Sequence, residues 1–293
     1  MHNQFHLITN LPFSGFFFSC QALRRRSRLI STSLILFIFT LTTLHAQEPH
    51  VPYVTTPPGV VDKMMEMADV GPGDYVIDLG SGDGRIVIDA AKRGAVGHGV
   101  EIDPVLVNLA EENAREAGVS DKVLFLQENV FHSDFSQASV ITTYMTTTLN
   151  TRLRPALLND LNPGARVVAH DFNMGAWKAD KHLKIDDHDV YLWIVPATIE
   201  GRWYWKINGK KFTMEARQQL QEIQLEVKSE DISLKVEESV LSGKNLNFTA
   251  VNPKNGIRYS FHGVVEEIAI KGLVQIHHDK EKWIEVWSAT TIR

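Results

Sequence analysis

Cysteine is almost absent from this chain of 293 residues. Its single cysteine, Cys20, lies within the first 46 residues. The remainder therefore contains no disulfide, no zinc-thiolate site and no cysteine nucleophile. Any chemistry there must come from oxygen and nitrogen side chains.

Acidic residues are absent from residues 1 to 46, whose only charges are four arginines between positions 24 and 28. An apolar stretch from Leu29 to Leu44 follows, and then the small residue Ala46. This order is typical of an export signal. We predict a signal peptide cleaved after Ala46 and an exported, periplasmic protein. The alternatives are an uncleaved membrane anchor, with the chain facing away from the cytosol, and a mitochondrial import signal.

An excess of basic residues is also lacking, since 30 Lys and Arg stand against 35 Asp and Glu. Loss of the N-terminal arginines would make the remainder more acidic still. Nonspecific nucleic-acid binding needs a basic surface, so we predict no nucleic-acid partner. Contact with a membrane is expected only through an uncleaved N-terminal segment.

The most informative stretch is residues 75 to 91, YVIDLGSGDGRIVIDAA. An apolar run with Asp78 near its end predicts a buried strand, alternating glycines predict a tight turn, and a helical pattern starts at Arg85. Glycine lets a ligand lie against the backbone, whose N–H groups are hydrogen-bond donors. A strand, a ligand-binding loop and a helix are therefore expected.

A second predicted strand, residues 99 to 104, ends in carboxylates. An acid at this place in a doubly wound sheet can accept hydrogen bonds from a ribose, and we assign that role to Glu101. Dinucleotide enzymes use the spacing G-x-G-x-x-G, whereas this chain has G-x-G-x-G. The spacing disfavours a dehydrogenase, which stays as an alternative.

Strands and helices alternate as far as residue 196, which predicts an α/β fold with a doubly wound, Rossmann-like parallel sheet. The expected helices are residues 59–70, 85 onward, 104–117 and 153–161, and the later strands are 122–127, 140–145, 165–170 and 190–196. From residue 201, eight short runs separated by turns predict a smaller all-β antiparallel domain, a barrel or a curved sheet. The predicted divisions are 1–46, 47–198 and 199–293.

The glycine loop, with Asp78 before it and Glu101 on the next strand, resembles the class I S-adenosylmethionine-dependent methyltransferases. Residues 52 to 196 include PYVTTP, GVEIDP, LRPALLNDLNPGARVVAHDF and VYLWIVP. These segments are similar to the branch that contains the lysine methyltransferases of the mitochondrial ATP synthase c subunit and adenine nucleotide translocase, with their bacterial relatives. The resemblance implies S-adenosyl-L-methionine as cofactor and a protein lysine as methyl acceptor, with a small molecule or lipid as the alternative.

The resemblance also implies a set of cofactor-binding residues. The glycine loop would hold the methionine part, Glu101 the ribose, and the N-terminal residues Tyr53 and Thr56 would close over the cofactor. Asn129 stands where the family has an aspartate that accepts the adenine amino group, and an amide oxygen can accept the same hydrogen bond. The set is Tyr53, Thr56, Asp78, Gly80, Ser81, Gly82, Gly84, Glu101, Asn129 and Val130.

The acceptor side departs from the family, because residues 142 to 146, TTYMT, replace the Asn or Asp followed by Pro-Pro of many amino-methylating relatives. Tyr144, His170 and Asp171 lie at the carboxyl ends of predicted strands and are expected to guide the acceptor or its proton, the alternative being that they cap strand ends. The histidines and aspartates at 182–188 and 277–279 are expected in solvated loops, so no metal site is predicted.

An exported enzyme would lack an obvious supply of a cofactor that is made in the cytosol. The alternative function is therefore a non-catalytic cell-envelope binding protein that retains the methyltransferase fold. The intact glycine loop favours the enzyme, because a disused pocket has no physical need for three alternating glycines.

Overall fold

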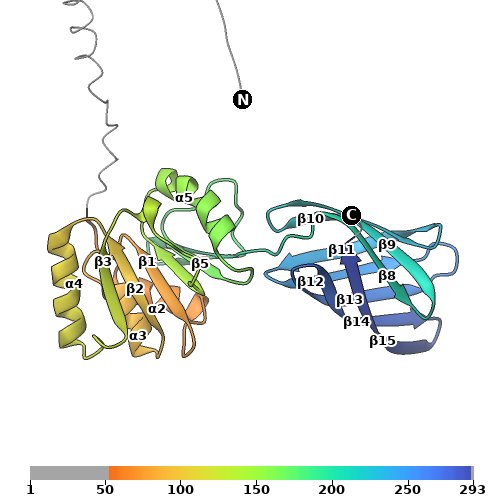
Figure 1. Cartoon of the computed structure of the whole chain (residues 1–293), viewed down its shortest axis with the longest axis horizontal. Coiled ribbons are helices and arrows are strands. Elements are labelled where there is room, and N and C mark those ends of the chain that lie inside the picture. Colours follow the sequence, from red (N-terminus) through yellow and green to blue (C-terminus); the bar gives the residue numbers. More distant parts are fainter. Residues whose placement is uncertain (1–52, 292–293) are drawn as a thin grey trace, which may run out of the picture. The chain divides into compact units, whose positions relative to one another are not determined.

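The computed structural model describes residues 53 to 291 (Figure 1). They form a seven-stranded sheet with helices, followed by a closed eight-stranded barrel. The predicted α/β class with a second antiparallel domain is confirmed. The predicted signal peptide or anchor lies outside the described residues. None of the helices in residues 53 to 291 is long and apolar enough to cross a membrane.

The sheet has the strand order β3-β2-β1-β4-β5-β7-β6. Strands β1 to β5 are parallel, whereas β7 runs antiparallel to both β5 and β6. The order reverses between β1 and β4, and open α/β sheets bind ligands at the carboxyl ends of strands at such a point. The bounds are β1 (Tyr75–Leu79), β2 (Val96–Glu101), β3 (Val123–Gln127), β4 (Val140–Thr143), β5 (Arg166–His170), β6 (Lys181–Ile185) and β7 (His188–Ile194).

Four helices and a short 3₁₀ turn accompany this sheet: α2 (Pro58–Met67), α3 (Arg85–Lys92), α4 (Pro104–Glu116), η1 (Val130–His132) and α5 (Thr147–Asp160). Apolar residues of α2 and α3 pack in one cluster with Val76, Val140 and Val168 of the sheet. The leucines of α5 pack in another with Ile77 and Ile141. Because successive strand residues point to opposite faces, the two clusters cover both sides of the sheet.

Strand β6 was not predicted from the sequence. Its residues, KHLKI, are mostly exposed at the edge of the sheet, where it pairs with β7 alone. Edge strands are commonly polar and rich in lysine, which protects their unpaired backbone groups and weakens the apolar pattern. The hairpin turns at Asp186, which has a φ of 51°. His182 and His188 therefore lie in strands, and the prediction of solvated loops was wrong for both.

The barrel comprises β8 (Gly201–Ile207), β9 (Lys210–Gln219), β10 (Glu222–Ser229), β11 (Ile232–Ser242), β12 (Asn245–Val251), β13 (Arg258–Val265), β14 (Ala269–His278) and β15 (Glu281–Thr291). Neighbouring strands pair in sequence, and β15 pairs with β8 to close it. Aromatic rings fill the interior: the ring of Trp205 lies 5.4 to 5.5 Å, centroid to centroid, from those of Phe212, Phe261 and Trp287. Trp193 lies outside the barrel and packs in the α/β core.

Candidate active site

The glycine loop connects β1 to α3 and lies against the end of β2. The N–H groups of Gly80 and Ser81 both donate to the carbonyl oxygen of Val100, at 2.9 and 3.0 Å. The φ angles of Gly80, Gly82 and Gly84 are 75°, 52° and 78°. Side chains disfavour this left-handed region, so the three glycines are required by the backbone path itself.

Gly82 and Gly84 each leave room for a neighbouring ring. A Cβ at Gly82 would lie 2.5 Å from the ring of Tyr53, and a Cβ at Gly84 would lie 2.6 Å from the ring of Phe125. Tyr53 therefore lies beside the loop, as its predicted role requires. The absence of a side chain at Gly84 allows α3 to pack against β3. The assignment of Gly84 to cofactor binding stays a prediction.

Glu101 fastens the glycine loop to the end of β2. Its Oε2 accepts the N–H of Gly82 at 2.9 Å, and its Oε1 accepts those of Ile102 and Asp103 at 2.8 and 3.0 Å. The residue is buried, with 8% of its surface exposed. Three backbone donors hold the carboxylate in one orientation at the place predicted for the ribose. A carboxylate has about four lone-pair sites, two on each oxygen, so one site on Oε2 stays free for a further hydrogen bond.

Asp78 is a buried carboxyl group without a cationic partner in the described part of the chain. Its Oδ1 accepts a hydrogen bond of 2.6 Å from the hydroxyl of Thr142. Burial raises the pKa of Asp78 to about 7 against that hydrogen bond, and Glu101 and Asp83 add repulsion. A bound cation would relieve this cost.

Asn129 and Ser81 are placed differently from what their predicted roles suggest. The Oδ1 of Asn129 accepts the N–H of Phe131 at 3.0 Å and so caps η1, leaving one lone pair for an adenine amino group. Val130 follows it, half-buried. The hydroxyl of Ser81 is buried beside Gly99 and has no hydrogen-bond partner in the described residues. The cofactor roles of these three residues stay predictions.

Thr56 connects the glycine loop to the end of β5. Its carbonyl oxygen accepts a hydrogen bond of 2.9 Å from Nη1 of Arg85, and Arg85 forms an ion pair of 2.6 Å with Asp83 in the loop. The Thr56 hydroxyl lies 3.1 Å from Nδ1 of His170. The segment before α2 therefore spans from the predicted cofactor site to the predicted acceptor site.

Tyr144, His170 and Asp171 meet at the ends of β4 and β5, as their positions in the sequence predicted. The Tyr144 ring stacks on that of His170 with 3.8 Å between centroids, and its hydroxyl lies 3.5 Å from Oδ2 of Asp171. His188, which was expected in a solvated loop, joins them: its Nδ1 lies 2.9 Å from Nε2 of His170 and 3.1 Å from the same Oδ2. A prediction of the β6–β7 hairpin would have placed His188 beside His170 and Asp171.

Burial and neighbouring charges set the protonation states of Tyr144, His170 and Asp171. Burial lowers the pKa of His170 to about 4, against the attraction of Asp171. Burial acts to raise the pKa of Asp171, but the Asp189 N–H, the His188 hydrogen bond and the neighbouring imidazoles bring it below its ordinary value. Burial, followed by the charge of Asp171, raises the pKa of Tyr144. At neutral pH the cluster therefore contains a carboxylate, a neutral His170 and a neutral phenol.

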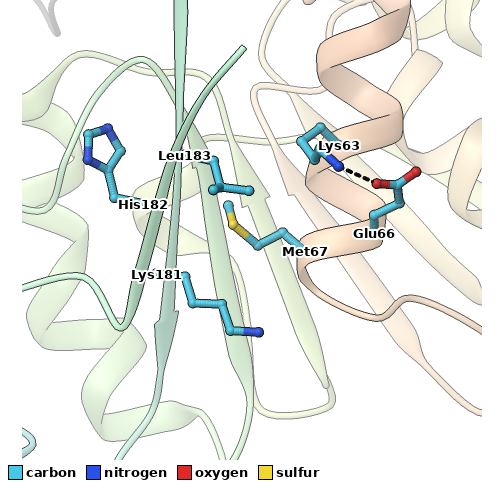
Figure 2. Close-up of a pocket in the computed structure, with 6 residues that line it drawn as sticks. All are labelled: Lys63, Glu66, Met67, Lys181, His182 and Leu183. Carbon is cyan, nitrogen blue, oxygen red and sulfur yellow. Dashed lines mark hydrogen bonds and ion pairs between the residues drawn. The ribbon is translucent and has the colours of Figure 1, made fainter.

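A separate pocket lies beside α2 and the edge strand β6. Figure 2 shows its lining, in which Lys63 and Glu66 of α2 form an ion pair of 2.5 Å. The other lining residues are Met67, Lys181, His182 and Leu183. None of them belongs to the predicted site, so we assign no part of the chemistry to this pocket.

Comparison with known proteins matches this site to a family. Residues 78–181 match the model described as the ANTKMT methyltransferase domain. A protein-lysine N-methyltransferase of Saccharolobus islandicus is 42% identical over 155 residues, which cover 50% of this chain and 95% of that protein. The chain belongs to the S-adenosylmethionine-dependent methyltransferases. The recognition made from the glycine loop is confirmed.

Other similar methyltransferases also match about half of the chain. The human lysine N-methyltransferase of the ATP synthase c subunit is 31% identical over 152 residues, covering 52% of this chain and 64% of that protein. A solved RNA methyltransferase of Salinibacter ruber, in complex with S-adenosyl-L-homocysteine, is 51% identical with a TM-score of 0.49, covering 50% of this chain and 96% of that one.

The residues of this methyltransferase fit its cofactor. S-adenosylmethionine carries an ammonium and a sulfonium, for which the buried carboxyl of Asp78 is a suitable partner. Its ribose hydroxyls are donors for Glu101, which is already oriented at the end of β2. The loop at Gly82 offers backbone without a side chain beside the Tyr53 ring. Asp78, Gly82 and Glu101 would therefore hold the cofactor, which supplies an electrophilic methyl group when bound.

Proposed function

We propose that this chain is a protein-lysine N-methyltransferase. The observation that carries the proposal is the cluster beside the cofactor loop, in which the Asp171 carboxylate and the Tyr144 ring lie together at the ends of β5 and β4. A lysine ammonium is attracted both by a carboxylate and by the face of an aromatic ring. The names of the archaeal and human relatives support the same acceptor.

The chain's own residues would mainly align the reactants. Methyl transfer is an in-line displacement with a neutral leaving group, and alignment supplies roughly 7 to 11 kcal/mol of such a barrier. The low pKa of Asp171 suits it to orient the ammonium rather than to accept its proton. His188, whose side chain is 32% exposed, offers the proton a route to solvent.

The acceptor can be identified by chemical blocking. Full-length protein is incubated with tritiated S-adenosylmethionine and a cell extract, and a matched extract has its lysines acetylated beforehand, so that their nitrogens can no longer accept a methyl group. We expect labelled methyl-lysine from the first extract only, and no effect of ribonuclease. The Asp171→Asn variant should lower the rate at least tenfold while binding S-adenosylhomocysteine normally, because the amide keeps the Asp189 contact but not the charge.

Two results would contradict a lysine acceptor. One is incorporation that survives acetylation and disappears with ribonuclease, which would indicate RNA. The other is incorporation into small molecules or lipid in both extracts.

The location of the protein stays part of the proposal: we infer export from residues 1 to 46, and fractionation of cells that express the full chain tests it.

A further inference from the structure

Three atoms that can offer a lone pair converge at the acceptor side of the site, from the end of β5, the residue after it and the start of β7. His170 Nε2, His188 Nδ1 and Asp171 Oδ2 are separated from one another by 2.9, 3.1 and 3.2 Å. His170 ends β5 and His188 begins the antiparallel β7, so the pairing of these strands brings them together. We call these three atoms the triangle; each lies within hydrogen-bonding distance of the other two.

Hydrogen bonds alone cannot satisfy the triangle. A ring nitrogen of neutral imidazole either carries a hydrogen or offers one lone pair. For His170 and His188 to bond each other, only one of the facing nitrogens can carry hydrogen. For both to bond the Asp171 carboxylate, both must carry it. At least one of the three contacts is therefore always repulsive while Asp171 is ionised, whereas a cation at the centre attracts all three atoms.

The distances suit an ion with open coordination positions. With metal–ligand bonds of about 2.1 Å, atoms 2.9 to 3.2 Å apart subtend roughly 90–100° at the ion. These are the angles between adjacent ligands of an octahedron. Two histidines and one carboxylate on one face of an octahedron are a known donor set for divalent transition metals, and the other positions stay open.

Outer contacts hold each ligand atom in place. Nδ1 of His170 lies 3.1 Å from the Thr56 hydroxyl oxygen, to which an Nδ1–H would donate, and this contact leaves the Nε2 lone pair facing the triangle. The Asp189 N–H donates to Oδ1 of Asp171 at 2.8 Å and leaves Oδ2 for an ion. Asp171 itself has a φ of 57°, a conformation that costs energy and is held by its surroundings. Such outer-shell support is typical of metal ligands.

We propose that His170, His188 and Asp171 bind one divalent transition-metal ion, for which Co²⁺ and Zn²⁺ serve as probes. The two nitrogen ligands disfavour Mg²⁺ and Ca²⁺, which prefer oxygen. Because the Asp171 carboxylate is also the group that we assign to the acceptor's ammonium, the ion and a lysine would compete for it. That competition rests on the proposed function, whereas the metal site does not.

The test is a titration of metal-free, full-length protein with Zn²⁺ by calorimetry and with Co²⁺ by visible absorption, without cofactor or acceptor. We expect one high-affinity equivalent of each ion, not displaced by Mg²⁺. His188→Ala and Asp171→Asn should weaken binding at least 100-fold, and Thr56→Val should weaken it about 10- to 100-fold through the His170 contact. His182→Ala is the matched control, since this exposed histidine of the same hairpin pairs with Asp189 outside the triangle.

The site would be overturned by folded wild-type protein that shows no saturable binding. It would equally be overturned if His188→Ala bound Zn²⁺ as tightly as wild type, or if His182→Ala alone removed binding. Circular dichroism of each variant excludes unfolding as the cause. Since no methyl transfer is measured, these results stand whether or not the acceptor is a lysine. In a transfer assay, Zn²⁺ is expected to raise the KM for the acceptor and to leave the affinity for S-adenosylhomocysteine unchanged.

Discussion

Asp78→Asn is expected to weaken S-adenosylmethionine binding at least 100-fold and, at the same time, to stabilise the unliganded protein above pH 7. The native carboxyl is buried beside a hydroxyl and two like charges, so its ionised form is costly until the cofactor's positive charge arrives. An amide keeps the Thr142 hydrogen bond without that charge. The variant thus separates stability from binding, which few substitutions do.

The ionisation of Asp78 fixes how the stability of the unliganded protein and its cofactor affinity change with pH. Burial raises the pKa of Asp78 from 3.8 to about 7, so the folded protein holds a proton that the unfolded chain releases. The stability that this proton gives is complete below pH 3.8 and is lost as the pH rises to about 7, by up to ~4 kcal/mol. Conversely, cofactor affinity should fall about tenfold per pH unit below 7, because binding must then expel the proton.

Urea unfolding of the unliganded protein and calorimetric titration, both from pH 5 to 8, check this prediction. Asp78→Asn should be more stable than wild type at pH 8 and should show a flat pH profile of binding. The account of Asp78 fails if the variant binds cofactor as wild type does, or if wild-type affinity does not change between pH 5 and 8.

Glu101→Ala is expected to lower cofactor affinity by 100-fold or more. The substitution removes the ribose ligand and leaves the N–H groups of Gly82, Ile102 and Asp103 without their acceptor, so the loop loses its attachment to β2. Hydrogen bonds to a charged group contribute about 1.5 to 3 kcal/mol each. Glu101→Gln should be nearly as damaging, because its amide cannot accept from donors on both sides.

The matched control for Glu101 is Asp103→Asn, two residues along the chain. Asp103 caps α4 by accepting the N–H of Val105 at 2.8 Å, and asparagine caps helices equally well. This variant loses a neighbouring carboxylate but should bind S-adenosylhomocysteine as wild type does. Normal binding by a folded Glu101→Ala protein would remove Glu101 from the cofactor site.

The cofactor side was predictable from sequence because it depends on local geometry. Three glycines in a left-handed path and an acid at the end of β2 are set by a short stretch of chain, and the structure brings them together. Asn129 shows the limit, since its side chain caps η1 in a way that spacing does not reveal.

The acceptor side depends on pairing across the sheet, which sequence patterns do not specify. His188 reaches His170 only because β7 runs antiparallel to β5. The β6–β7 hairpin was not predicted, because the exposed, lysine-bearing strand β6 lacks an apolar pattern. In the barrel, Gly272 interrupts the apolar pattern of strand β14. A side chain is excluded there: a Cβ would lie 1.9 Å from the His262 carbonyl oxygen.

The most direct test of the central claim is calorimetric titration of the full-length protein with S-adenosylhomocysteine, and separately with NAD. The product cofactor avoids turnover and fills the same site. The account predicts saturable binding of one S-adenosylhomocysteine per chain and none of NAD. Folded protein that binds NAD instead, or neither compound, would contradict the assignment of the glycine loop, Asp78 and Glu101 to a methyl-donor site.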